Sequence, residues 1–113
     1  MWIKKIPHEA GGGGIGCLLY VQFVMVTYDE AKRQTNLAKH GIDLGACEGV
    51  FDAPMLTEED LRVPYGEQRL KSLAWLRDRV VVLIWTDRLT GPHLISCRCG
   101  DKHETQRYFE AFL

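Results

Sequence analysis

The sequence predicts a single α+β domain with two N-terminal helices, a three- to four-stranded, mainly antiparallel sheet and a C-terminal helix. Three observations support this prediction. The chain has 113 residues, which is enough for one domain with a packed core and too few for two ordinary domains. Helix-capping patterns occur soon after residue 26 and again soon after residue 100. Between them, strand-like apolar segments are joined by short, turn-like links.

The first 26 residues differ in character from the rest, and we interpret them as an N-terminal extension of a domain that occupies residues 27–113. Consecutive glycines at 11–14 predict a flexible joint, because glycine has maximal backbone freedom. Residues 18–26 are rich in β-branched and aromatic side chains and predict a strand that completes the sheet or lies along its edge. Alternatively, translation of the natural protein starts at Met25, and the residues before it are not part of the protein.

Two helices are expected at the start of the domain. Thr27 and Glu30 have the spacing of a capping box, which predicts a helix over residues 28–40. Asp43 is expected to cap a second, shorter helix over residues 44–51, whose apolar side chains recur on one face.

An exposed loop is expected over residues 55–66, which carry acids, a proline and a glycine. Three strands are predicted to follow, at residues 67–76, 79–85 and 93–99. The middle segment is almost entirely apolar, as expected of a strand covered on both faces. Since the links are short, we expect an antiparallel meander, closed by a helix that Asp101 and Glu104 cap.

The composition of the chain bears on whether it binds nucleic acids or membranes. The chain has 14 Lys and Arg against 15 Asp and Glu, so its net charge of -1 does not mark it as a nucleic-acid-binding protein. The acids concentrate between residues 43 and 60, which we expect to form a solvated face, whereas residues 62–107 carry an excess of positive charge. The longest apolar run is about 12 residues, short of the roughly 20 that span a membrane, so no membrane partner is expected.

The four cysteines are interpreted as reduced, mostly buried thiols of a cytoplasmic protein, because disulfide frameworks belong mainly to small secreted chains. Cys97, Cys99 and His103 offer three possible zinc ligands where a structural site uses four. No metal site is therefore expected.

Several separated motifs carry more specific information. They are Y-D-E-A-K at 28–32, Asn36, K-H-G-I-D at 39–43, V-F-D at 50–52, E-Q-R at 67–69, I-S-C-R at 95–98, Glu104 and Tyr108. In this order they resemble the BrnT family, the toxins of bacterial BrnT–BrnA toxin–antitoxin pairs, over about residues 27–108. Two departures are conservative: Tyr28 replaces the family's tryptophan, and small residues, Cys97 and Gly100, stand where the family has alanines.

The resemblance implies a compact fold similar to RelE-type ribonucleases. It also implies a metal-independent, cofactor-free RNA-cleaving activity that inhibits translation, and neutralisation by a cognate BrnA-like antitoxin. DNA is then contacted only through that antitoxin. The alternative is a non-catalytic binding module that acts by assembling with a DNA-binding antitoxin, and the net charge favours this alternative slightly.

Cleavage of RNA without a metal needs a base for the ribose 2′-hydroxyl, an acid for the leaving oxygen, and cations that stabilise the charged phosphorane. Arg98 is the main candidate for the cation, because a planar guanidinium meets two phosphate oxygens at once. Its alternative role is to pair with a carboxylate such as Glu104. Glu67 and Arg69 are expected on one strand face beside Arg98, as a base and a second phosphate clamp, or else as a structural salt bridge.

The alternation of side chains along a strand separates the last predicted strand into two faces. Ile95, Cys97 and Cys99 are expected on the core face. Ser96 and Arg98 are then expected on an open surface.

The first helix offers a second set of candidates. His40 can exchange a proton near neutral pH and shares a helix face with Lys32 and Asn36, so it is an alternative to Glu67 for proton transfer. Lys39 is a candidate RNA contact beside it. The structural alternatives are that His40 complements the helix dipole and that Asn36 ties down the following turn.

Glu104 and Tyr108 lie one turn apart on the last helix and are candidates for support of the active face. Tyr108 alternatively anchors the helix. Trp75 and Trp85 are expected to pack in the core rather than to stack on RNA bases.

Overall fold

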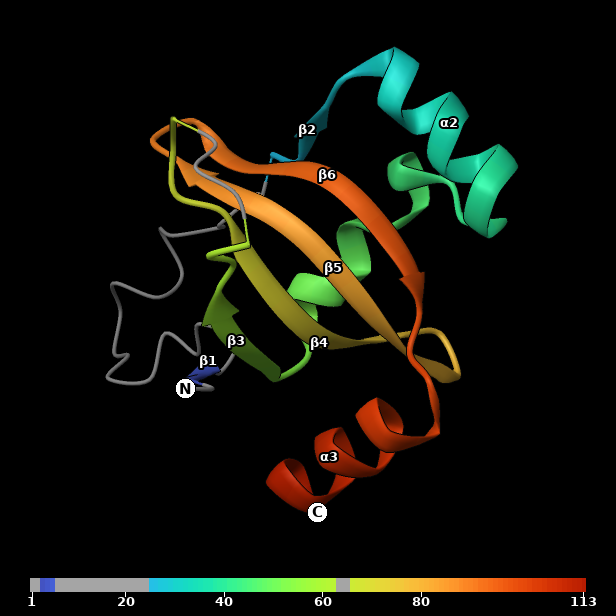
Figure 1. Ribbon diagram of the computed structural model, residues 1–113, viewed down its shortest axis with the longest axis vertical. Coiled ribbons are helices and arrows are strands. Elements are labelled where there is room, and N and C mark those ends of the chain that lie inside the picture. The colour runs from blue at the N-terminus through green and yellow to red at the C-terminus, as the bar shows by residue number, and fades with distance from the viewer. Residues whose placement is uncertain (1–2, 6–24, 63–65) are drawn as a thin grey trace, which may run out of the picture.

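The computed structural model describes residues 3–5, 25–62 and 66–113. The predicted glycine joint at 11–14 and most of the predicted strand at 18–26 lie outside the described residues. Within them the chain has a mixed α+β fold built on one sheet, as Figure 1 shows. No helix in the described part of the chain is long and apolar enough to cross a membrane.

Among the described residues the sheet has six strands, in the order β1-β3-β4-β5-β6-β2. They are β1 (Ile3–Lys5), β2 (Thr27–Tyr28), β3 (Met55–Glu59), β4 (Leu70–Leu76), β5 (Arg79–Arg88) and β6 (Gly91–Cys99). Every neighbouring pair is antiparallel except β2 with β6, so the predicted antiparallel meander of β4, β5 and β6 is confirmed. The predicted number of three to four strands is wrong, because short strands at both edges enlarge the sheet.

β3 lies inside the segment 55–66 that was expected to be an exposed loop. Met55 and Leu56 are buried on opposite faces of the sheet, as alternation along a strand requires. Thr57 is also buried and forms a hydrogen bond of 2.7 Å with Ser72 of β4. The acids that suggested a loop follow at the end of this short strand.

The first predicted helix is confirmed as α2 (Glu30–His40). It starts later than expected, because Asp29 caps it: its Oδ1 accepts a 2.8 Å hydrogen bond from the amide of Ala31. Thr27 belongs to β2 instead, and its hydroxyl is hydrogen-bonded to the His93 ring at 2.8 Å. Gly41 ends the helix with a φ of 72°, which glycine adopts without steric cost.

The second predicted helix is replaced by two 3₁₀ segments, η1 (Leu44–Ala46) and η2 (Glu48–Asp52). The expected cap is present, since Asp43 Oδ1 accepts a 2.8 Å hydrogen bond from the amide of Gly45. The C-terminal helix α3 (Lys102–Phe112) is confirmed, with the expected capping box.

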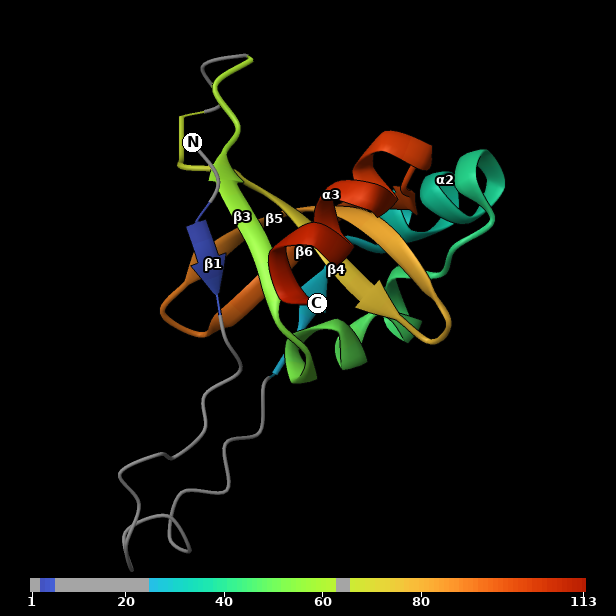
Figure 2. The ribbon, with the colours of Figure 1, turned by 90° about the horizontal axis from the view of Figure 1, so that it is seen from below.

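Two apolar clusters lie on opposite faces of the sheet, with α3 on one side and the 3₁₀ segments on the other (Figure 2). On the 3₁₀ side the nearly inaccessible Trp85 packs edge-on against Phe51, with ring centroids 5.2 Å apart. On the α3 side Trp75 stacks on Tyr108 at 6.5 Å. Both tryptophans therefore pack against the apolar clusters, as predicted: Trp85 is buried and Trp75 is partly buried. Tyr108 anchors α3, and its hydroxyl donates to the carbonyl of Pro54 at 2.9 Å.

The buried side chain of Asn36 fastens α2 to the sheet. Its amide nitrogen donates to the carbonyls of Ile42 at 2.8 Å and Cys97 at 2.9 Å. Its amide oxygen accepts from the backbone N–H of Cys97 at 2.9 Å. The predicted tie to the following turn is thus present, and a second tie to β6 accompanies it.

Replacing Asn36 by alanine is expected to lower the free energy of unfolding by about 2–4 kcal/mol, because three backbone polar groups lose their partner at a buried position. Chemical denaturation measures the loss. Lys39→Ala, an exposed change on the same helix, serves as the control and should cost less than about 0.5 kcal/mol. Equal stabilities of the Asn36→Ala and Lys39→Ala proteins would contradict this role of Asn36.

Candidate functional site

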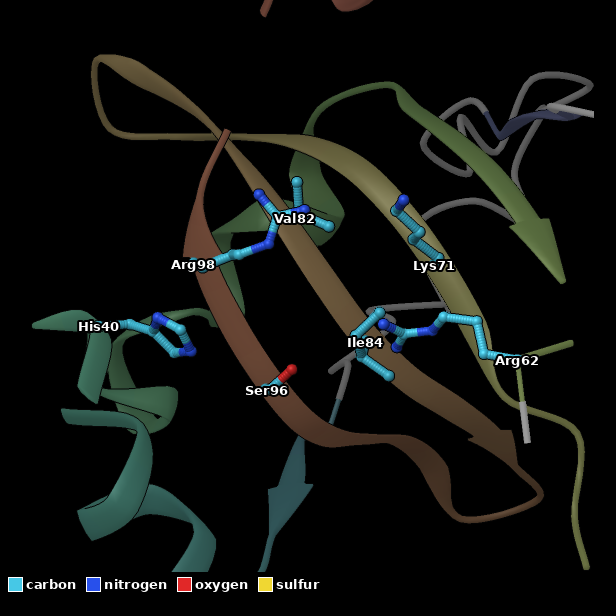
Figure 3. Close-up of a pocket in the computed structure, with 7 residues that line it drawn as sticks. All are labelled: His40, Arg62, Lys71, Val82, Ile84, Ser96 and Arg98. Carbon is cyan, nitrogen blue, oxygen red and sulfur yellow. The ribbon is translucent and has the colours of Figure 1, made fainter. Parts of the chain in front are cut away.

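A pocket of about 230 Å³ lies on the face of the sheet that carries α3. Its lining residues are His40, Arg62, Lys71, Val82, Ile84, Ser96 and Arg98. Figure 3 shows Val82 and Ile84 of β5 between two groups of polar side chains: Arg98, Ser96 and His40 on one side, and Lys71 and Arg62 on the other. Positively charged side chains around an apolar floor favour an anionic ligand.

Arg98 reaches the pocket from β6 and is held by Glu104 of α3. Its Nη1 and Nη2 donate to the two carboxylate oxygens of Glu104, each at 2.9 Å. Glu104 Oε1 also accepts from the amide of Asp101, so the carboxylate that orients Arg98 is fixed by the capping box of α3. The predicted pairing of Arg98 with Glu104 is present, and Arg98 lines the pocket at the same time.

The Arg98–Glu104 contact affects both groups. The hydrogen bond from Arg98 is the main reason that the pKa of Glu104 falls to about 2. The same bond raises the pKa of Arg98. The Glu104 side chain is only 14% exposed, while Arg98 is 41% exposed. Arg98 is therefore a permanently charged, oriented and solvent-accessible guanidinium.

Ser96 and Arg98 share the pocket because they lie two positions apart on β6 and therefore face the same side of the sheet. A shift in the pairing of β5 with β6 places Ile84 opposite Ser96 and Trp85 opposite Leu94. Leu94 and Cys97 consequently face the core. Cys97 is buried as expected. Cys99 lies on the same face, opposite Val81 in the register, but it is exposed, and Ile95, at the register shift, is only partly buried.

His40 enters the pocket lining from the last turn of α2. The hydrogen bonds of Asn36, one turn earlier, hold this end of α2 beside Cys97, the residue before Arg98. His40 and Arg98 are thus brought to one pocket from segments that lie far apart in the sequence.

Glu67 and Arg69, expected beside Arg98, are not part of the pocket lining. Both precede the start of β4 at Leu70. The Glu67 carboxylate accepts from Arg88 Nη2 at 3.2 Å, in an exposed ion pair with β5. The Arg69 carbonyl accepts from the amide of Asp60 at 2.8 Å, which continues the β3–β4 pairing.

The remaining predicted residues also lie outside the lining. Lys32 and Lys39 are exposed on α2, whereas Asn36 and Tyr108 are buried and structural. Glu104 contributes through Arg98.

Sequence reasoning missed Arg62 and Lys71. The excess of positive charge over residues 62–107 was the available signal, but it did not distinguish these two from other cations. Lys71 lies opposite Glu58 in the β3–β4 register. Arg62 is paired with Asp60 at 2.8 Å, and Asp60 is buried. The acidic stretch 43–60 is therefore not a solvated face throughout.

The described residues contain no group of three or more His, Cys, Asp or Glu side chains that could hold a metal ion. Residues 28–104 match a protein-family model described as "Ribonuclease toxin, BrnT, of type II toxin-antitoxin system". A search of curated proteins finds no match.

The Glu104→Gln protein is expected to differ from the wild type in the pH dependence of stability. The folded pKa of about 2 lies below the unfolded value of about 4.3, so the contribution of Glu104 is complete above about pH 5 and is lost as the pH falls toward 2. Glutamine can still complete the capping box.

Urea denaturation of both proteins between pH 7 and pH 2.5 measures this effect. We expect the difference in unfolding free energy to shrink as the pH falls. Glu110→Gln, on the exposed side of the same helix, should show no such trend. A difference for Glu104→Gln that stays constant across the range would contradict the assigned cause of the pKa shift.

Proposed function

This chain belongs to the BrnT family of ribonuclease toxins of type II toxin–antitoxin systems, and we propose that it is an endoribonuclease whose cationic pocket binds the phosphate that is cleaved. Membership of this family supports endoribonuclease activity at the level of the family. The observation that supports this pocket is the juxtaposition of an oriented arginine, Arg98, with a histidine, His40.

The proposed reaction is attack by the ribose 2′-oxygen on the adjacent phosphorus. The new P–O2′ bond forms as the P–O5′ bond breaks, which leaves a 2′,3′-cyclic phosphate and a 5′-hydroxyl. One proton leaves the 2′-hydroxyl and one is delivered to the departing 5′-oxygen. His40 takes part in this transfer, and Arg98 stabilises the additional negative charge on the phosphorane.

We propose that the reaction is metal-independent, because the guanidinium of Arg98 and the neighbouring cations can supply the positive charge that the phosphorane needs. We propose the remaining parts from the resemblance of the sequence motifs to the BrnT family. They are a RelE-like fold, inhibition of translation in the cytoplasm, and neutralisation by a BrnA-like antitoxin through which DNA is contacted.

We also propose that residues 27–113 form the toxin domain and that residues 1–26 are an extension to it. The start of the family match at residue 28 supports this boundary.

Arg98→Lys is expected to reduce RNA cleavage by at least about tenfold and to leave the melting temperature nearly unchanged. Lysine keeps a positive charge beside Glu104 but lacks the planar guanidinium, which pairs with both oxygens of Glu104 and still has further N–H donors for a phosphate oxygen. Cleavage of total RNA by purified protein, in the presence of a chelator, measures the effect. Arg88→Lys, which alters an arginine outside the pocket, is the matched control.

Two outcomes of this assay count against the proposal. Intact RNA after incubation with folded wild-type protein would favour the non-catalytic binding module. Full activity of the Arg98→Lys protein would mean that Arg98 only stabilises the start of α3, through its contact with Glu104.

His40→Gln is expected to lower kcat by roughly 10²–10⁴-fold with a smaller effect on KM, because a proton-transfer group acts mainly in the transition state. Steady-state cleavage of a short RNA measures both constants. Gln34→Ala changes an exposed residue of the same helix that is not a site candidate, and it should leave kcat within about twofold. A purely structural role of His40 predicts instead a lower melting temperature and an unchanged kcat for the folded fraction.

A further inference from the structure

We infer that Arg62 is a second phosphate-binding residue of this pocket, oriented by the buried carboxylate of Asp60 and facing Arg98 across the apolar floor. The inference rests on the proposed ribonuclease function and deepens it, because it assigns the cation opposite Arg98. Arg62 lies outside the motifs that carry the family resemblance.

The contact between Arg62 and Asp60 fixes the direction of the guanidinium. Nε donates to Oδ1 and Nη2 donates to Oδ2, both at 2.8 Å, so the pair is bidentate. The Asp60 side chain is only 2% exposed, whereas that of Arg62 is 68% exposed. A buried carboxylate strongly disfavours loss of its cation, and the accessible part of Arg62 therefore stays directed by a rigid partner.

Asp60 is itself held by the sheet. Its backbone N–H donates to the carbonyl of Arg69 at 2.8 Å, which extends the β3–β4 pairing by one position. The hydrogen bond from Arg62 is the main cause of the lowered pKa of Asp60, so the carboxylate remains ionised beside the guanidinium. Arg62 is thus anchored to the sheet although its own residue follows the end of β3.

Arg62 and Arg98 approach the pocket from opposite sides, as Figure 3 shows. Their charges interact: Arg62 opposes the upward shift of the Arg98 pKa that Glu104 causes. Two like charges that face one cavity repel each other, and an anion between them relieves the repulsion. A phosphodiester has two non-bridging oxygens, which allows one oxygen to meet each guanidinium.

The two arginines are oriented in the same way. Each is held by both oxygens of a poorly exposed carboxylate, Asp60 or Glu104, that is fixed by a backbone N–H bond or a helix cap. Such pre-oriented charges need little reorganisation when negative charge develops on the phosphorane. Asp60 and Glu104 are accordingly positioning residues, and Arg62 and Arg98 contact the phosphate.

The first test measures RNA cleavage by Arg62→Gln and Arg62→Lys proteins, with Arg88→Gln as the matched control. Arg62→Gln is expected to lower kcat/KM by roughly 10–100-fold, and Arg62→Lys to restore part of that loss. Arg88→Gln should remain within about twofold of the wild type. Wild-type cleavage by Arg62→Gln would overturn the inference.

The second test does not depend on activity or on a variant that folds. Inorganic phosphate is titrated into ¹⁵N-labelled wild-type protein, and the arginine Nε–H resonances are followed by NMR. We expect the resonances of Arg62 and Arg98 to move together along one saturable curve while that of Arg88 stays in place. Movement of the Arg98 resonance alone would overturn the inference that Arg62 also binds phosphate.

The two tests separate this inference from the proposed function. If folded wild-type protein leaves RNA intact, the ribonuclease proposal fails, and the phosphate titration still decides whether both arginines bind an anion. If the wild type cleaves RNA and Arg62→Gln cleaves it equally well, only the inference fails.

Discussion

The hydrogen bonds between Asn36 and the backbone of Cys97 set the geometry on which the pocket depends. They join α2 to β6 at a point one helical turn before His40 and one residue before Arg98. Because an amide side chain supplies both a donor and an acceptor, it pairs with the edge of β6 as a neighbouring strand would. The distance between the proposed proton-transfer group and the proposed phosphate-binding group is therefore fixed by a buried, fully hydrogen-bonded contact.

The net charge of the chain does not reveal the positive charge of the pocket, because carboxylates pair with the pocket arginines locally. A net charge of -1 describes the chain as a whole, yet the pocket lining includes two arginines, a lysine and a histidine. Asp60 and Glu104, which balance the charges of Arg62 and Arg98, are poorly exposed, whereas both arginine side chains are accessible to solvent. Bulk charge is consequently a poor guide to what this surface binds.

Local signals in the sequence were sufficient for the elements whose boundaries depend on nearby residues. The capping box of α3 and the left-handed Gly41 act over a few positions, and the short links between β4, β5 and β6 favour a meander. The failures involve long-range pairing. β3 looked like a loop because two of its five residues are acidic, and it is a strand because Thr57 and its neighbours pair with β4. Likewise, alternation alone could not foresee the register shift that places Leu94 with Cys97 in the core.

The difference between local signals and long-range pairing also explains which residues of the candidate site the sequence could predict. Arg98, His40 and Glu104 were identified because they belong to recognisable motifs, whereas Arg62 follows a short strand that the sequence did not reveal. Glu67 and Arg69 also belong to a motif, but both precede β4, which starts at Leu70, and Lys71 lies in the lining instead. In the proposed site a poorly exposed carboxylate fixes the orientation of each arginine, and that partner is identified by tertiary contacts rather than by spacing. Asp60 is only two positions from Arg62, yet its role depends on burial beside β4, which spacing along the chain does not encode.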